Sequence, residues 1–255
     1  MIDLDFISLL LLFGSGILAG FIDSIAGGGG IITLPALLAI GLPPHQALAT
    51  NKLQSSFGSF TATLNYARVG LMKPKELILG VFFTFIGASS GAITVQFFKA
   101  DSLVSLIIVM LIIIFIYTLL TPKLGEKSQK SRMNHYLFYT IFGFLIGFYD
   151  GFFGPGTGSF WTMVLVLFIG LNLKEATAQT KLFNFTSNIV SLSIFIYLGL
   201  VVWIAGLVMG VGQIIGAFLG SNLVHKKEIK FIRLFFLIIV ALTIIKLMWQ
   251  HFYSH

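Results

Sequence analysis

Long hydrophobic segments, separated by short polar or glycine-rich stretches, occupy most of the 255-residue chain. Most of them approach the roughly 20 apolar residues that a membrane-spanning helix needs. Segments 31–42 and 159–171 are too short to span comfortably as single helices, and each begins directly after a glycine cluster. The pattern predicts an all-α polytopic membrane protein. The predicted hydrophobic segments are 4–22, 31–42, 46–67, 77–98, 102–121, 136–151, 159–171, 175–198, 202–223 and 231–250.

The composition supports the same class. Hydrophobic residues make up 57% of the chain and charged residues only 10%, whereas soluble domains carry about a quarter charged residues. The first segment has no cationic region before it and no small-residue cleavage site before Gly14, so we expect a retained membrane helix and not a signal peptide. The formal charge of +7 is typical of cationic cytoplasmic loops, and no basic surface that would bind nucleic acid is predicted.

The two halves of the chain repeat one pattern. Residues 20–31 read GFIDSIAGGGGI and residues 147–158 read GFYDGFFGPGTG, and a short apolar run and a Lys-bearing segment follow both. We therefore expect a first transmembrane repeat at 1–122, a cytoplasmic linker at 123–135 and a second transmembrane repeat at 136–255. Matched positions include Gly20 and Gly147, Asp23 and Asp150, Gly27 and Gly154, Lys52 and Lys181, Gly70 and Gly199, and Gly91 and Gly220.

The distribution of Lys and Arg predicts how the repeats are oriented. Cations cluster at 68–75, 123–132 and 226–233, whereas 198–204, the counterpart of the first cluster, carries no charge. Because cytoplasmic loops carry an excess of Lys and Arg, we place the three clusters in the cytoplasm and both termini outside. A loop that is cationic in one repeat only is expected when the repeats are inverted in topology. A duplication without inversion is the alternative.

The glycine clusters are the first candidate site. Gly and Pro are the poorest helix formers, and unwound backbone at membrane depth is tolerated where it is buried in protein or lines a watery cavity. The two short Gly-broken helices would then point their N-terminal amides into a cavity near the midplane, where they attract an anion. Close helix packing is the alternative role. The predicted substrate-binding residues here are Gly27, Gly28, Gly29, Gly30, Gly154, Gly156, Thr157 and Gly158.

Lys52 and Lys181 are the second candidate. Each lies a few residues into a long apolar segment, where a deep charge is costly and by default faces the protein interior. As an alternative, both side chains extend to the membrane interface. We expect the lysines to attract the anion and nearby polar side chains to orient it, namely Asn51, Gln54, Gln179, Thr180 and Asn184.

Asp23 and Asp150 are the third candidate. Each ends a hydrophobic segment just before a glycine cluster. Each is a candidate for proton coupling or for positioning a lysine. Alternatively, each carboxylate bonds only to exposed amides of the broken turn. The doubled residues suggest that Asp and Lys compensate one another within the membrane, although the sequence does not place them in contact.

Several long motifs resemble the TauE/SafE sulfite-exporter family, also called the toluene-sulfonate uptake permease family. They are FIDSIAGGGG at 21–30, ALATNKLQ at 47–54, GFYDGFFGPGTGSFWT at 147–162 and KLFNFTSN at 181–188. The resemblance covers the whole chain and implies a bacterial inner-membrane protein that moves small sulfur-bearing or organic anions such as sulfite, sulfoacetate or sulfonates. Pro155 and Thr157 stand where many members carry Gly, so the substrate preference is expected to differ.

These features predict a secondary transporter of small anions that works by alternating access around one site shared by the repeats. An anion channel is the alternative, because broken helices and lysines serve it equally well. A membrane enzyme is disfavoured, since the chain has no Cys, no metal-ligand spacing among its histidines and no acid–base pair on one helix face. We expect no cofactor, no metal and no nucleic-acid partner. The sequence leaves open the anion, its direction, the coupling ion and the oligomeric state.

Overall fold

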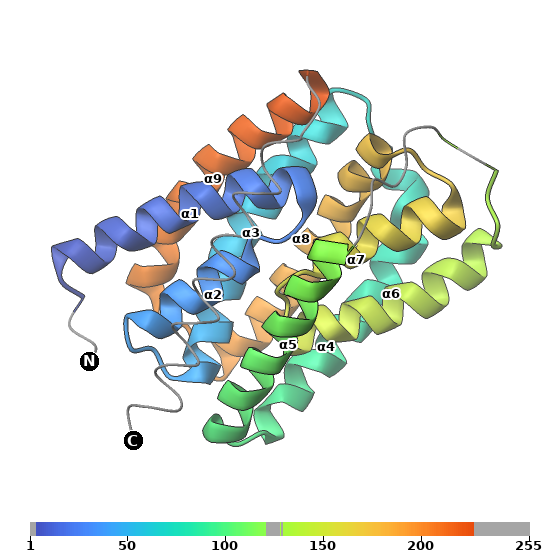
Figure 1. Cartoon of the computed structure of the whole chain (residues 1–255). Coiled ribbons are helices and arrows are strands. Elements are labelled where there is room, and N and C mark those ends of the chain that lie inside the picture. The colour runs from blue at the N-terminus through green and yellow to red at the C-terminus, as the bar shows by residue number, and fades with distance from the viewer. Residues whose placement is uncertain (1–3, 121–127, 129, 227–255) are drawn as a thin grey trace.

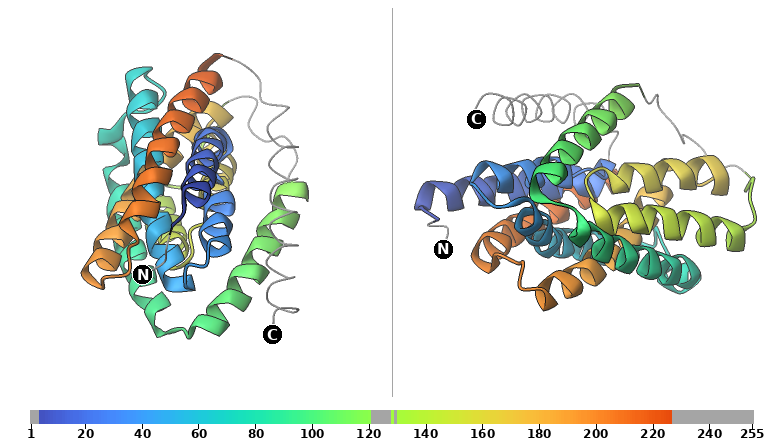
Figure 2. Two further views of the ribbon diagram at one scale, coloured as in Figure 1. Left: turned by 90° about the vertical axis from the view of Figure 1, so that its left-hand side faces the viewer. Right: turned by 90° about the horizontal axis from the view of Figure 1, so that it is seen from below.

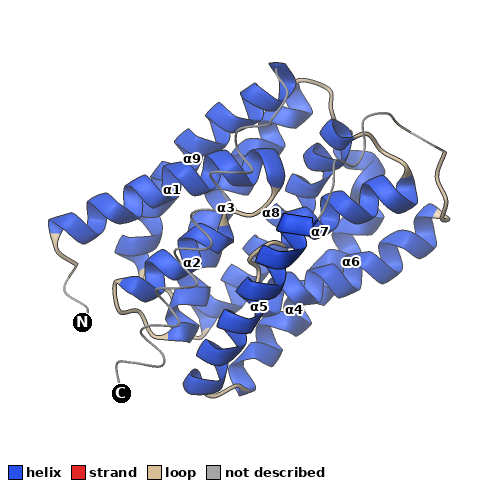
Figure 3. Cartoon of the chain, in the orientation of Figure 1, coloured by secondary structure: helices blue, strands red, loops and turns tan. Residues whose placement is uncertain are grey.

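A computed structural model describes residues 4–120, 128 and 130–226, and the regular elements of this part are helices (Figure 1, Figure 3). The all-α prediction is confirmed there. The predicted segment 231–250 and part of the predicted linker lie outside the described residues. The helices are α1 (Phe6–Ala26), α2 (Gly30–Ala39), α3 (Pro44–Arg68), α4 (Ile78–Thr94), α5 (Ala100–Leu120), α6 (His135–Phe152), α7 (Thr157–Val164), α8 (Leu173–Tyr197) and α9 (Trp203–Lys226). Short 3₁₀ turns, Pro74–Leu77 and Val95–Phe97, flank α4, and a π turn, Leu165–Ile169, extends α7.

Helices long and apolar enough to cross a membrane are present in the described part. These stretches are Phe6–Ile25, Pro74–Phe97 and Trp203–Val224. Their outward faces are hydrophobic: the side chains of Phe6, Phe82 and Ile204 are all more than half exposed. Large contiguous apolar surface of this kind is typical of a protein whose surroundings are lipid.

Glycine separates α1 from α2, and again α6 from α7. After α1 ends at Ala26, Gly27 has a φ of 72°, a left-handed conformation that glycine adopts without steric cost. Gly156, directly before α7, has a φ of 81°. The two short helices begin at Gly30 and Thr157, slightly earlier than predicted, because the last residues of each glycine cluster are themselves helical.

Helices of the first half pack against helices of the second half, and we call this arrangement crosswise packing. In the first such pair α1 lies along α9, with Gly16 against the backbone of Met209 and Gly220 against Ser24. Residue numbers rise together in the two contacts, so α1 and α9 run in the same direction. A Cβ added at Gly16 would lie 2.3 Å from the Met209 carbonyl oxygen, so glycine is what permits this distance between the backbones.

The second crosswise pair is α4 with α6. Gly80 lies against Tyr139 near the start of both helices, and Gly91 lies against the backbone of Phe152 near the end of both. These two helices therefore also run in the same direction. α3 and α9 also run in the same direction, whereas α4 and α9 run in opposite directions (Figure 1, Figure 2).

Candidate functional site

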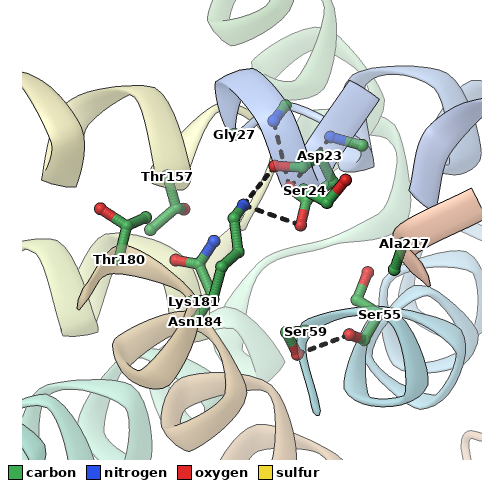
Figure 4. Close-up of polar contacts among 12 residues, drawn as sticks. Asp23, Ser24, Gly27, Ser55, Ser59, Thr157, Thr180, Lys181, Asn184 and Ala217 are labelled. Atoms are coloured by element: carbon green, nitrogen blue, oxygen red, sulfur yellow. Dashed lines mark hydrogen bonds and ion pairs between the residues drawn. The ribbon is translucent and has the colours of Figure 1, made fainter. Parts of the chain in front are cut away.

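Two Lys–Asp pairs join the halves of the chain at the glycine breaks. Lys52 Nζ on α3 lies 2.6 Å from Asp150 Oδ1 near the end of α6. Lys181 Nζ on α8 lies 3.0 Å from Asp23 Oδ2 near the end of α1, and Figure 4 shows this pair. Each ammonium also donates to the backbone carbonyl of its own aspartate. Each lysine is thus paired with the aspartate of the opposite half.

Both lysines are enclosed by protein. The side chains of Lys52 and Lys181 are 1% and 0% exposed, so neither extends to a surface as the interface alternative requires. A buried ammonium without a partner would be costly, and here a carboxylate neutralises each one. The contact between Asp and Lys that the sequence suggested, but did not place, is present at both positions.

The two aspartates have different surroundings. Asp23 Oδ1 accepts hydrogen bonds from the amides of Gly28 and Gly29, at 3.1 and 3.3 Å, so this carboxylate also holds the broken turn. Asp150 Oδ2 accepts a hydrogen bond from the Ser187 hydroxyl instead. The Asp23 side chain is 20% exposed, against 4% for Asp150. Asp23 is therefore the more accessible of the two carboxylates.

A cavity of about 20 Å³ lies at the glycine breaks, against both aspartates and Lys52. This volume holds about one water molecule, so the described conformation leaves little free space at the glycine breaks. The structure brings most of the predicted substrate-binding residues together here. Those that line the cavity are Gly28, Gly29, Gly30, Asn51, Lys52, Gly154, Gly156, Thr157, Gly158 and Asn184.

The other predicted residues do not line the cavity. Gly27 packs directly against Gly158, so the two glycine breaks contact one another. Lys181 is connected to the cavity through Asp23, which lines it. The predicted residues outside the lining are Gly27, Gln54, Gln179, Thr180 and Lys181.

Gln54 and Thr180 belong to hydrogen-bond networks that support the lining. Gln54 Nε2 donates to Asn51 Oδ1 at 2.8 Å and to Thr33 Oγ1 at 3.0 Å. In the second half, the hydroxyls of Thr180 and Thr162 lie 3.2 Å apart. The contact that matches Thr162–Thr180 in the first half is the hydrogen bond from Thr33 Oγ1 to Asn51 Oδ1, and it helps Gln54 to fix the side chain of Asn51 at the cavity.

Ser55, Asn188 and Gln213 also line the cavity, although they are not among the residues predicted to bind substrate. Helical spacing contained a signal for two of them, because Ser55 follows Asn51 by four residues and Asn188 follows Asn184 by four. The signal for Gln213 is an uncharged polar side chain inside the apolar stretch that forms α9. It carries neither a charge nor a glycine motif, and motif reasoning therefore passed over it.

The sequence is similar to those of known proteins along nearly all of its length. The sequence model of the family described as Sulfite exporter TauE/SafE matches residues 12–247. The chain belongs to the TauE/SafE sulfite exporter family. The family resemblance predicted from the motifs is thereby confirmed.

The relatives of this TauE/SafE chain are named as membrane transporters. It is 48% identical over 240 residues to "Probable membrane transporter protein YfcA" of Escherichia coli K12, covering 94% of this chain and 89% of that protein. It is 45% identical over 245 residues to "Probable membrane transporter protein ORF9" of Sinorhizobium sp., covering 96% and 94%. It is 38% identical over 253 residues to a "Probable membrane transporter protein" of Haemophilus influenzae, covering 99% of each.

The two halves of the TauE/SafE chain supply different chemistry beside the cavity. Gln54 in the first half is replaced by Phe183 at the matched position of the second. Phe183 stacks on Trp161 with ring centroids 4.4 Å apart. At this position the first half has a polar hydrogen-bond network and the second half has packed aromatic rings. The surroundings of the cavity are therefore not symmetric.

Two amides at the cavity keep hydrogen-bonding capacity. Asn184 Oδ1 is buried and has no partner within the described residues. Gln213 is 2% exposed, and its side chain forms no hydrogen bond with the described part of the chain. Because buried polar groups normally find partners, these unused hydrogen-bonding groups are unusual for a protein interior. The described residues contain no group of three or more His, Cys, Asp or Glu side chains arranged to hold a metal.

Proposed function

We propose that this TauE/SafE protein is a secondary transporter of small anions of the sulfur-containing or organic class, such as sulfite, sulfonates or sulfoacetate. The observation that carries the proposal is the pair of buried contacts, Lys52 with Asp150 and Lys181 with Asp23, beside a polar cavity in an apolar helical protein. Ionisable residues inside a membrane are costly and mark substrate or ion pathways. The names of the family and of its relatives support transport.

We infer that residues 1–122 and 136–255 are repeats of inverted topology. α4 and α9 occupy matched positions in the repeat and run in opposite directions, which supports inversion (Figure 1). The crosswise Lys–Asp pairs and the crosswise packing of α1 on α9 and of α4 on α6 support it as well. In transporters of this plan the substrate site lies near the midplane between the repeats, and one repeat rocks against the other around it.

We place the protein in the bacterial inner membrane with both termini outside. α3 ends at Arg68, so Arg68 and the loop that follows it, with Lys73 and Lys75, lie at one end of the bundle. α4 and α6, which are parallel, begin after Lys73 and Arg132 respectively. The gathering of cations supports a cytoplasmic position for that end, including linker 123–135.

The charge balance of the site supports proton coupling. A carboxylate already neutralises each lysine, so an anion has to replace a carboxylate beside an ammonium. When an aspartate is protonated and an anion binds, the net charge of the buried site stays the same, and no uncompensated charge is buried. We assign the proton to Asp23 and the anion to Lys181, because Asp23 is the more exposed carboxylate. Asp150 and Lys52 form the second, more enclosed pair.

The remaining contacts to the anion come from backbone amides and side-chain amides. α2 and α7 begin at the cavity, so their positive dipole ends face it. Asn51, Asn184 and Gln213 supply side-chain amides there. Gln54 supports the lining through its hydrogen bond to Asn51. A bound oxyanion would thus be met by donors from both halves.

A carrier is favoured over an anion channel. The relatives are named as transporters, and the described residues leave a cavity of only about 20 Å³ at the site and not a wide pore. A carrier alternates between closed and open forms of one site, whereas a channel conducts through a continuous open pore.

Uptake into proteoliposomes tests the proposal. Purified protein is reconstituted, and the entry of sulfite, a sulfonate or sulfoacetate is measured with and without a proton gradient. We expect saturable uptake that the gradient accelerates, and a large loss in Lys181→Gln, with Lys75→Gln as a control that removes an exposed charge elsewhere. Unsaturable conductance would contradict the carrier, and undiminished uptake in both Lys181→Gln and Lys52→Gln would remove the lysines from the site.

A further inference from the structure

A second recess lies on the outside of the bundle, between α3 and α9. It has a volume of about 360 Å³, within the usual range for ligand sites. Its walls are apolar over most of their length, with Phe57, Phe60 and Leu64 from α3 and Ile214 and Phe218 from α9. Phe60, Leu64 and Phe218 are 45%, 39% and 52% exposed. The walls thus form an open apolar groove on a surface that faces lipid.

Arg68 closes one end of the groove. It is the last residue of α3 and is exposed. No carboxylate of the described residues pairs with it, and its guanidinium has no hydrogen-bond acceptor among them. An exposed guanidinium at the end of an apolar groove complements a ligand with an anionic head and an apolar tail, because Arg binds phosphate through several donors.

The polar character of the groove increases towards Arg68. Asn65 also lines it, and Asn65 Nδ2 donates to Ser221 Oγ at 2.7 Å and to Asn222 Oδ1 at 3.1 Å, which ties α3 to α9 at this level. The other end, at Phe57, is beside Gly58, which packs against the side chain of Gln213. The groove therefore runs from the level of the central cavity to the cationic end of the bundle.

The length of the groove fits one leaflet. Phe57 and Arg68 are 11 residues apart (68 − 57), which corresponds to about 17 Å at the rise of an α-helix. Half of a hydrocarbon core is about 15 Å thick. The end at Arg68 belongs to the cationic side that we place in the cytoplasm, and the cytoplasmic leaflet contains anionic lipid.

We propose that this groove binds one anionic phospholipid, with its phosphate on Arg68 and an acyl chain along Phe57, Phe60, Leu64, Ile214 and Phe218. The proposal is independent of the transported substrate and of the Lys–Asp pairs. Because α3 and α9 belong to different halves of the chain and both line the central cavity, a lipid in the groove would bridge the two halves. Its occupancy would then regulate the movement of one half against the other.

Lipid titration of the purified full-length protein, followed by native mass spectrometry, tests the proposal. The probes are phosphatidylglycerol and phosphatidylcholine with identical acyl chains, and glycerol phosphate, which has no chain. The variants are Arg68→Gln, Arg68→Lys and, as a matched control, Lys75→Gln, which removes an exposed cation outside the groove. We expect phosphatidylglycerol to bind about fivefold more weakly to Arg68→Gln, since one basic side chain near a membrane surface contributes about that factor.

The other arms are expected to behave differently. Lys75→Gln should bind phosphatidylglycerol as the unaltered protein does, and phosphatidylcholine should bind weakly to every variant. Arg68→Lys should bind phosphatidylglycerol more tightly than Arg68→Gln, because it keeps the charge, but more weakly than the unaltered protein, because it loses the forked donors. Thermal unfolding without added lipid should be the same for Arg68→Gln and the unaltered protein, because the side chain has no partner to lose.

Four results would overturn the proposal. Equal weakening by Arg68→Gln and Lys75→Gln would indicate diffuse attraction to the cationic end. Equal binding of the two lipids would remove the role of the charge. Tight binding of glycerol phosphate would indicate a site for free phosphate and remove the role of the chain. A lipid-free dimer that excludes phosphatidylglycerol would assign the groove to a second copy of this chain.

Discussion

At the scale of single residues, Lys52 distinguishes a structural role for the buried pairs from a transport role. The side chain of Asp150 is only 4% exposed, and Lys52→Gln removes the cation that neutralises it. Removing one partner of a buried pair costs about 3–5 kcal/mol, so we expect a clearly lower Tm. The double variant Lys52→Gln/Asp150→Asn replaces the pair by neutral amides and should recover most of the Tm but not anion uptake. Recovery of uptake together with the Tm would leave the pair a structural role alone.

Gln213 provides a test of the cavity that does not involve charge. Gln213→Met keeps the length of the side chain and removes the amide. A hydrogen bond to a charged group contributes about 1.5–3 kcal/mol, so we expect the KM for anion uptake to rise roughly tenfold or more at an unchanged Tm. Thr84→Val is the matched control, because Thr84 occupies the corresponding position of the first half, is buried and does not line the cavity. An equal rise in both variants would speak against a contact between Gln213 and the anion.

Charged residues and uncharged residues within the repeated motifs could be predicted from the sequence, whereas an uncharged residue outside them, Gln213, could not. Lys52 and Asp150 were recognisable because a charge is out of place in an apolar segment. Gln213 was not, since a single amide in a membrane helix is compatible with a packing role. Only the packing of α9 against Gly20 and Gly58 turns the Gln213 side chain towards the cavity.

At the scale of helices, glycine determines how closely the halves approach. A Cβ added at Gly216 in α9 would lie 2.0 Å from the Ile17 carbonyl oxygen in α1, whereas Gly14 has nothing within 4 Å. We expect Gly216→Ala to force the helices apart and lower the Tm by several degrees or prevent folding. Gly14→Ala should be neutral or slightly stabilising, because Ala is favoured over Gly in a helix by about 0.5–1 kcal/mol. Thermal unfolding of both purified variants is the measurement. Equal Tm values would contradict close α1–α9 packing.

Helix positions followed well from the hydrophobic pattern, because backbone hydrogen bonding within lipid leaves a helix as the default for an apolar segment. The ends of short helices were less predictable. Segment 159–171 comprises most of an α-helix, Thr157–Val164, and then the π turn Leu165–Ile169, which ends at Gly170 with a φ of 81°. Neither the π turn nor its end at Gly170 has a marker in the hydrophobic pattern.

At the scale of the whole molecule, orientation is the prediction that decides between inverted and parallel repeats. The chain has no Cys, so single cysteines can be introduced without background. Lys73→Cys and Tyr197→Cys are suitable, because these residues are 78% and 90% exposed. Lys73 lies in the connection from α3 to α4, and Tyr197 is the last residue before the matched connection from α8 to α9. In spheroplasts, a membrane-impermeant maleimide should label Tyr197→Cys at once and Lys73→Cys only after permeabilisation. Labelling of both from the same side would contradict inversion.

Composition and the local order of residues were enough to predict a membrane protein, a repeated pattern, the family and the types of residue in the proposed site. Which lysine meets which aspartate depends on the tertiary structure. Lys52 and Asp150 are 98 residues apart, and Lys181 and Asp23 are 158 apart. A contact over such a separation depends on how helices pack, and here packing through glycine contacts sets α1 against α9 and α4 against α6. That packing brings the two glycine breaks into contact, with Gly27 against Gly158, at the cavity where we propose the single transport site.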